Sequence, residues 1–210
     1  IIFGVLFGKC VYGGFGRNIF NPAITGRLFI YIAFPGRMTS LWQAPSFFGL
    51  APIDGMTSAT PLEMMREGVL PDILHLLSGL RSGSAGEGAA VLIVLAAVYL
   101  VYTKTANWRA MVSTLVSFGA VAAALFYSGI AGAFPPAEAM LSGSILFVAV
   151  FMTTDPVSAP KKPLSIWIYG AIIGVTAAAV RNFSLFPEGT SFAILFGNTF
   201  ASLIDELVSG

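Results

Sequence analysis

Between Gly88 and Ile204 the chain alternates between apolar segments and short polar loops, and this alternation limits the folds that it can adopt. Each apolar segment has 15 to 19 residues, close to the roughly 20 residues that an α-helix needs to cross a lipid bilayer. The backbone of a segment inside a bilayer has no water to bond with, so helices are the expected structure. The predicted spans are 88–102, 110–128, 137–154, 165–180 and 190–204.

The amino-acid composition agrees with a membrane protein and excludes several functions. Hydrophobic residues make up 56% of the chain and charged residues 10%, whereas soluble domains carry about 25% charged residues. A formal net charge of +1 without a basic stripe excludes nucleic acid as a partner. The single cysteine, Cys10, excludes an internal disulfide and a cysteine metal cluster within this chain, and we expect no metal site.

Two further apolar stretches lie near the start of the chain. Residues 1–8 read as the end of a transmembrane helix, and because the chain starts inside this stretch, we expect earlier helices to precede it. Residues 23–34 are too few for a full crossing and predict one half of a broken helix. Arg27 within them is either a functional or paired charge or a side chain that reaches the interface, and the sequence leaves both open.

A glycine-rich loop that carries Asn18 and Asn21 separates these two stretches. Such a polar loop is costly at membrane depth unless it lines a site or packs on protein. Residues 186–200 echo this region, since they again pair a Gly/Pro break with a short apolar span that carries an asparagine, Asn198. Matching breaks in two halves of a chain suggest an internal repeat around a central site.

The polar segment 35–87 contains a clear helix start at Thr60-Pro61-Leu62-Glu63. Thr60 is the expected N-cap, Pro61 suits the first helical position, and Glu63 completes a capping box. The helix is expected to end near Gly68, since glycine is common directly after a helix. A capped surface helix explains these residues without any further function.

The wider stretch resembles an acceptor motif for a covalent cofactor. Its residues Asp54, Thr57, Ser58, Ala59 and Thr60 follow the pattern at which bacterial flavin transferases attach FMN to threonine through a phosphoester bond. Small residues at 58 and 59 would let the transferase and the flavin approach the backbone. A phosphate on Thr60 would also lie at a helix N-terminus, which favours an anion. Ser58 departs from the family pattern, where glycine is common.

The basic residues of the loops predict the orientation in the membrane. Alternating spans place the following basic residues on one side: Lys9, Arg17, Lys104, Arg109, Lys161 and Lys162. The intervening loop 129–136 has no lysine or arginine, and the loop 181–189 has only Arg181. The positive-inside rule makes the basic side cytoplasmic, so segment 35–87 and Thr60 are expected on the outer side.

Asp155 follows the predicted span 137–154 and precedes Pro156. An acid at a helix break, beside several hydroxyl groups, suits a path for a cation or a proton. A plain interface residue or a helix cap is the alternative. We favour the ion path.

Three motifs occur together, and in the order that one family shows. They are Tyr12-Gly13-Gly14-x-Gly16-x-Asn18-x-x-Asn21-Pro22-Ala23, then Asp54–Thr60, then Thr154-Asp155-Pro156-Val157 with Pro187-Glu188-Gly189. With them the chain resembles the NqrB/RnfD family of membrane flavoproteins, whose members are subunits of the Na⁺-pumping NADH:quinone reductase (Nqr) or of the Rnf complex. The resemblance covers the whole sequence. Phe34-Pro35 and Trp42 are slightly more similar to the Rnf branch.

The resemblance implies an all-α polytopic membrane protein with one transmembrane domain over 1–210, built from two inverted repeats with broken helices, similar to urea transporters. It implies a subunit of a multi-subunit redox pump in the cytoplasmic membrane of a bacterium or archaeon, which moves Na⁺ or H⁺. Electrons would pass through FMN on Thr60, attached by a flavin transferase. Asn18 and Asn21 would lie near a noncovalent riboflavin, and Asp155 and Asp205 would serve the ion path.

Two other functions stay open. A channel or carrier of the urea-transporter type, without a redox role, would use the helix breaks but not the Asp54–Thr60 motif. A structural scaffold subunit would use none of the motifs. The presence of covalently bound flavin would distinguish a redox subunit from a carrier and from a scaffold.

Overall fold

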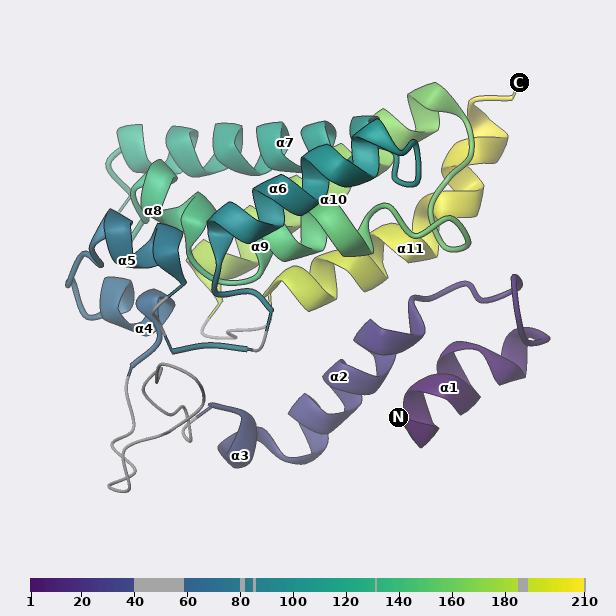
Figure 1. Cartoon of the computed structure of the whole chain (residues 1–210), viewed down its shortest axis with the longest axis horizontal. Coiled ribbons are helices and arrows are strands. Elements are labelled where there is room, and N and C mark those ends of the chain that lie inside the picture. Colours follow the sequence, from purple (N-terminus) through teal and green to yellow (C-terminus); the bar gives the residue numbers. More distant parts are fainter. Residues whose placement is uncertain (40–58, 80–81, 85, 131, 185–188, 210) are drawn as a thin grey trace.

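A computed structural model of the chain describes residues 1–39, 59–79, 82–84, 86–130, 132–184 and 189–209 (Figure 1). Throughout this part of the chain the secondary structure is helical, without strands, as the apolar spans predict. The α-helices are α1 Ile2–Gly8, α2 Pro22–Ala33, α3 Pro35–Thr39, α4 Pro61–Arg66, α5 Ile73–Ser78, α6 Ala90–Tyr102, α7 Trp108–Tyr127, α8 Pro136–Leu141, α9 Ile145–Phe147, α10 Pro163–Phe183 and α11 Gly189–Leu207. A 3₁₀ turn, η1, covers Cys10–Tyr12, and a π-helical turn, η3, covers Val148–Met152.

Helices α7 and α10 are long and apolar enough to cross a membrane, and they pack side by side (Figure 1). They run in the same direction. Near their first turns, the rings of Trp108 and Trp167 meet edge to face with centroids 6.0 Å apart. Farther along both helices, the guanidinium of Arg181 lies 4.9 Å from the centre of the Phe118 ring.

Small residues let α7 and α10 approach closely. A Cβ atom on Gly170 would lie only 2.7 Å from the Cβ of Ser113, so glycine is needed at this contact. A Cβ atom on Gly174, one turn later, would likewise collide with the side chain of Ser117. Ser113 Oγ donates a hydrogen bond of 2.6 Å to the carbonyl oxygen of Trp167. Small residues four positions apart are a common device for packing helices in membranes, where close contact replaces the hydrophobic effect.

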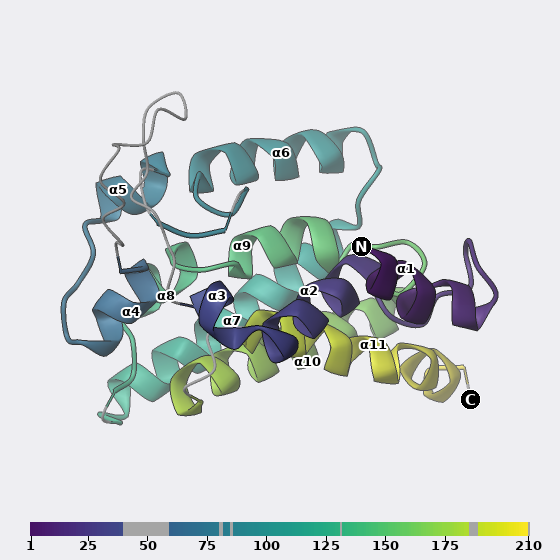
Figure 2. The ribbon, with the colours of Figure 1, turned by 90° about the horizontal axis from the view of Figure 1, so that it is seen from below.

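Helix α11 packs against α10 in the opposite direction. Ser165, at the start of α10, donates to the carbonyl oxygen of Ile204 near the end of α11. At the other end, Gly189 lies against Val180, where its Cβ would be 3.1 Å from a methyl group. Residues of α7, α8, α10 and α11 form the main hydrophobic core, to which α4 contributes Leu62 and Met65. Helix α10 thus packs against both α7 and α11, and the three helices supply much of this core (Figure 2).

The prediction of one continuous span over 137–154 is wrong. Helix α8 ends at Leu141, and Ser142 is extended with a ψ of 148°. Gly143 has a φ of +64°, in the left-handed region that favours glycine. The chain then resumes as α9 and the π-helical turn η3. The backbone of a π-helical turn departs from the α-helical bonding pattern, which often marks a functional segment.

The prediction that Arg181 is a loop charge is also wrong. Its side chain is buried, and Nη1 donates to the carbonyl oxygens of Ala139, at 2.7 Å, and Ser142, at 3.2 Å. The last carbonyl groups of a helix lack partners within the helix, so Arg181 satisfies those that the break at residue 142 leaves open. Loop 184–189 thus carries no lysine or arginine, which agrees with the predicted charge asymmetry.

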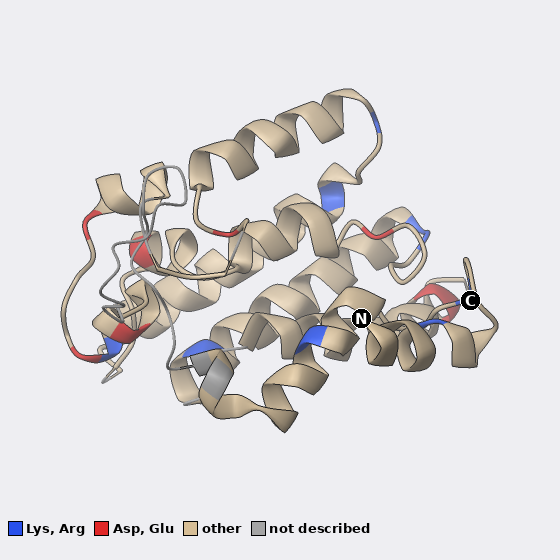
Figure 3. Cartoon of the chain, turned by 60° about the horizontal axis from the view of Figure 1, so that its bottom comes forward, with Lys and Arg blue, Asp and Glu red and all other residues tan. Residues whose placement is uncertain are grey.

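The predicted basic loops lie at one end of the helices and the Thr60 helix at the other. Helix α10 has 21 residues, so its axis is about 32 Å long. At its start, Lys161 and Lys162 bond to Asp205. At its end, Arg66 of α4 donates to the carbonyl oxygen of Ser184 at 2.9 Å. Figure 3 shows long uncharged stretches of helix between the charged loops.

Candidate functional site

Thr60 caps α4 as the sequence predicts. Its Oγ accepts a hydrogen bond of 3.3 Å from the Glu63 amide, and its own amide donates to Glu63 Oε2 at 2.9 Å. The Thr60 hydroxyl also donates to Glu63 Oε2, at 3.2 Å. The predicted capping box is therefore confirmed. Helix α4 has only six residues, so its dipole adds little to the binding of an anion.

The surroundings of Thr60 suit a covalent attachment point. Ala59 is exposed and Thr60 is half-buried, so this end of α4 is open to solvent at Ala59. An ester at Oγ removes the proton that Oγ gives to Glu63 but leaves Oγ free to accept from the Glu63 amide. The other motif residues, Asp54, Thr57 and Ser58, lie outside the described residues.

The structure brings together three predicted site residues that lie far apart in the sequence. A cavity of about 540 Å³ is lined by Asn18, Asn21 and Asp155, together with Lys9 and Met152. It lies between the loop before α2 and the loop after η3. Its size is that of a small-molecule site, typically a few hundred Å³. The sequence did not predict that the asparagines and the acid share one cavity.

The two asparagines hold the loop before α2 in place. Asn21 is the N-cap of α2, and its Oδ1 accepts from the amides of Ala23 and Ile24. Its Nδ2 donates to the sulfur of Met152 at 3.7 Å, which ties the loop to η3. Asn18 Nδ2 donates to the carbonyl oxygen of Phe20 at 3.2 Å. Both ends of the Asn21 amide are thus engaged with protein, so it shapes the cavity rather than offering an unbonded amide to a ligand.

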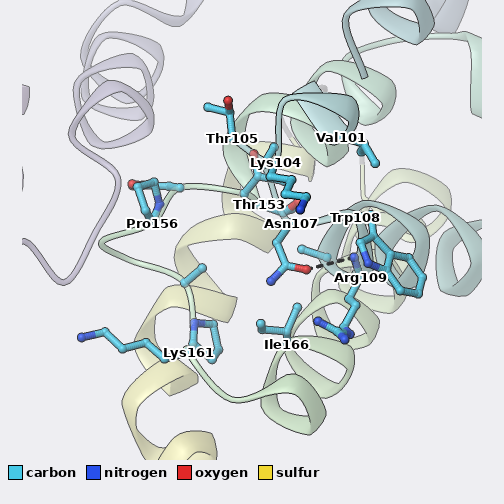
Figure 4. A pocket seen from close by; sticks show the side chains of 16 residues that line it. Val101, Lys104, Thr105, Asn107, Trp108, Arg109, Thr153, Pro156, Lys161 and Ile166 are labelled. Carbon is cyan, nitrogen blue, oxygen red and sulfur yellow. Dashed lines mark hydrogen bonds between the residues drawn. The ribbon is translucent and has the colours of Figure 1, made fainter. Parts of the chain in front are cut away.

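Asp155 lines this cavity and a second, neighbouring one. Its Oδ1 accepts from the Val157 amide at 3.1 Å, and its Oδ2 accepts from Ser158 Oγ at 2.7 Å. The second cavity has a volume of about 450 Å³ and is also lined by Lys104, Arg109 and Lys161 (Figure 4). Both carboxylate oxygens stabilise the turn that follows η3, so the capping alternative is part of what Asp155 does.

Asp205 lies at the same end of the helices but does not line these two cavities. Its carboxylate accepts from the amides of Lys161, at 2.8 Å, and Lys162, at 3.2 Å, directly before α10. It lies beyond the apolar span, which ends at Ile204. Burial raises the pKa of the Asp205 carboxyl, but the hydrogen bonds from these amides and from Ser165, with the Lys162 charge, outweigh burial and lower that pKa.

Arg27 is paired with a polar side chain. Its Nη2 donates to Ser84 Oγ at 2.9 Å. Because Ser84 is uncharged and lies in the polar segment before α6, this bond agrees with both interpretations of Arg27. Among the described residues, no group of three or more His, Cys, Asp or Glu side chains could hold a metal ion.

Sequence reasoning did not predict a buried polar pair between α10 and α11. Tyr169 Oη and Asn198 Oδ1 are 2.7 Å apart, and both side chains are buried. Among the described residues, Asn198 Nδ2 has no hydrogen-bond partner. Asn198 stood out in the sequence only as part of the repeated break, whereas Tyr169 gave no signal, because a tyrosine in an apolar span is ordinary.

The comparisons with known proteins agree with the motifs. The family model described as "NQR2, RnfD, RnfE family" matches residues 1–210. A subunit of the Na(+)-translocating NADH-quinone reductase of Pseudomonas aeruginosa is 37% identical over 224 residues, which cover 99% of this chain and 53% of that protein. A subunit of the ion-translocating oxidoreductase complex of Actinobacillus succinogenes is 32% identical over 236 residues, covering 96% of this chain and 66% of that protein.

The chain spans about half the length of the NADH-quinone reductase relatives that it matches. Its likeness extends over nearly all of its own residues, including the loops that carry Asn18, Thr60 and Asp155. With both the family model and these relatives matching along its whole length, the chain belongs to the NQR2, RnfD, RnfE family.

Proposed function

We propose that this chain is the membrane flavoprotein subunit of an ion-translocating redox complex of the Nqr or Rnf type, with FMN bound covalently to Thr60. The observation that carries the proposal is the position of Thr60, which caps α4 beside an exposed Ala59 and ends the acceptor motif. The names of the relatives, which are subunits of such complexes, support the same assignment.

In this proposal Thr60 is an anchor. Its hydroxyl forms the phosphoester, and the small side chain of Ala59 leaves room for the flavin transferase that makes the bond. Thr60 takes no part in acid–base chemistry. When bound, the FMN would supply the electron-transfer chemistry of the subunit. Because α4 lies at one end of α10, the attached group would need redox partners on other subunits of the complex.

The test is the mass of the intact protein and its flavin fluorescence after denaturation, in a host that makes a flavin transferase. The wild type should gain about the mass of FMN minus water and keep its fluorescence on a denaturing gel. Thr60→Ala and Thr60→Asn should lose both. Asparagine is a good N-cap, so Thr60→Asn keeps α4 capped and removes only the attachment oxygen. Absence of covalent flavin from the wild type would contradict the proposal.

We further propose that Asp155 and Asp205 serve the path of Na⁺ or H⁺. Asp155 carries the stronger case, since its half-buried carboxylate lines two cavities at the end of the helices opposite α4. Asp155→Asn in the purified, reconstituted complex should reduce ion uptake per electron transferred. Asp72→Asn, at the exposed N-cap of α5, is the matched control, because asparagine retains that cap. An unchanged ratio in Asp155→Asn would remove Asp155 from the path.

The cavity of about 540 Å³ is our proposed site for riboflavin, shaped by Asn18 and Asn21. Noncovalent flavin should be released from the wild type on denaturation and be depleted in Asn18→Ala. The covalent flavin on Thr60 should remain in that variant, which separates the two sites.

A carrier of the urea-transporter type without a redox role is the second candidate. The observation in its favour is the helix break at Ser142 and Gly143, since broken helices are common around transport sites. That the chain is built from two inverted repeats, similar to those of urea transporters, is likewise our proposal. Solute flux into liposomes without an electron donor, through a protein free of covalent flavin, would favour this candidate.

A further inference from the structure

The second cavity beside Asp155 has an excess of positive charge. It is lined by Lys104, Arg109 and Lys161, and by Asp155 as the acid (Figure 4). One carboxylate cannot balance three cations, and the Asp155 carboxylate is held in its own turn by hydrogen bonds from Val157 and Ser158. In Figure 4 the Lys161 side chain extends away from Lys104 and Arg109, which leaves these two as the cations on one side of the cavity.

Lys104 occupies a backbone position that favours glycine. Its φ is +56°, in the left-handed region, and it directly follows Thr103, the C-cap of α6. The Lys104 amide donates to the carbonyl oxygen of Val101 at 3.0 Å, and the Thr105 amide donates to that of Leu100 at 3.0 Å, as at many helix ends. Any side chain strains this conformation. A lysine here lowers stability and places a cation at the cavity, and such strain is typical of functional positions.

Aromatic side chains place the cavity at the level of a membrane surface. The Arg109 guanidinium lies 5.3 Å from the centre of the Trp108 ring, which itself contacts the ring of Trp167. Trp108 and Trp167 are 46% and 36% exposed and lie near the starts of the two helices that are long enough to cross a membrane. Tryptophan is enriched at the lipid headgroup level, where phosphate groups also lie.

An apolar track continues from this cavity along α7. Val112 and Val116 follow Trp108 at intervals of four residues, so all three lie on one face of the helix. Both valines are exposed, Val116 by 62%. A cationic pocket at the headgroup level, joined to an exposed apolar helix face, matches the two halves of a phospholipid.

We propose that this cavity binds the headgroup of an anionic phospholipid, with the phosphate held by Lys104 and Arg109 and an acyl chain along Trp108, Val112 and Val116. Basic pockets between helices on the cytoplasmic side of a membrane protein are suited to such headgroups. The site is distinct from Thr60, which lies at the other end of α10, and it does not depend on a bound flavin.

The test is a titration of the intact protein in detergent with short-chain phosphatidylglycerol, read by native mass spectrometry. Phosphatidylcholine and inorganic phosphate form the comparison arms. Binding of phosphatidylglycerol should saturate at one lipid and be about fivefold weaker in Lys104→Gly and in Arg109→Gln, since one cation near an anionic lipid surface contributes about that factor. Arg17→Gln, which removes one exposed charge at the same end of the helices, should bind as the wild type does.

The unfolding temperature of the Lys104→Gly variant shows whether weaker lipid binding is caused by misfolding. Glycine relieves the strain at φ +56°, so this variant should unfold at a higher temperature than the wild type while binding less lipid. Equal binding of phosphatidylcholine, displacement of the lipid by equimolar inorganic phosphate, or an equal loss in Arg17→Gln would overturn the proposal. A lower unfolding temperature for Lys104→Gly would contradict the strain on which it rests.

Discussion

Arg181 Nη1 donates a hydrogen bond of 2.7 Å to the carbonyl oxygen of Ala139, which joins the end of α10 to the end of α8. The two residues are 42 positions apart, and the contact lies directly beside the break at Gly143, whose Cβ would be 3.0 Å from Arg181 Nη2. A buried cation thus stabilises an interrupted helix. The break is maintained by the tertiary structure rather than by the local sequence alone.

Replacing Arg181 with methionine should destabilise the protein. Methionine fills a similar volume but donates no hydrogen bond, so the carbonyl oxygens of Ala139 and Ser142 would lose their Arg181 donor. A hydrogen bond to a charged group contributes about 1.5–3 kcal/mol, and we expect a loss in this range. Unfolding by SDS in mixed micelles measures it. Arg17→Met, on an exposed loop residue, is the control, and equal stability of the two variants would contradict the role of Arg181.

Gly174→Ala should separate α7 from α10. The new methyl group would meet the Thr114 carbonyl, the Ser117 hydroxyl and the Phe118 amide nitrogen, the last at 2.8 Å. Overpacking of this kind costs about 1–3 kcal/mol. Gly119→Ala on α7 is the matched control, because its Cβ would lie an ordinary 3.6 Å from the end of the Met140 side chain. Thermal unfolding in detergent should show a lower midpoint for Gly174→Ala alone.

Asp205→Asn should remove part of the pH dependence of stability. The folded-state pKa of Asp205 is lowered, so its carboxylate contributes stability that is fully present above the unfolded-state pKa of about 3.9. That contribution is lost as the pH falls through the lower folded-state pKa. The free energy of unfolding of the wild type should therefore fall more steeply below about pH 4 than that of Asp205→Asn. Parallel curves for the two proteins would show that Asp205 has no such role.

The native cysteine tests the proposed orientation. Cys10 is exposed and lies next to Lys9, which lines the cavity with Asp155. If the basic end is cytoplasmic, a membrane-impermeant maleimide should label Cys10 in inverted vesicles and not in intact cells. Cys10→Ser removes the signal and serves as the control. Labelling in intact cells would place Lys9 on the outer side and Thr60 on the inner side.

The sequence predicted the local structure well, because local structure depends on neighbouring residues. The apolar segments gave α6, α7, α10 and α11, and the spacing of Thr60 and Glu63 gave the capping box. The alternation of spans also grouped the basic loops correctly, since Lys9, Lys104 and Lys161 line two neighbouring cavities. Family membership followed from motif order. In each of these cases the deciding residues are close in sequence or repeat with a fixed period.

Three features depended on the tertiary structure. Hydropathy cannot distinguish a continuous span from one broken at Ser142 and Gly143, because the polar partner that stabilises the break is Arg181, about 40 residues away. The shared cavity of Asn21 and Asp155 likewise requires the loop before α2 to lie against η3. The sequence by itself thus determined the helices, their caps and the family, whereas long-range packing decided where the chain interrupts a helix, buries a charge and brings its polar groups together.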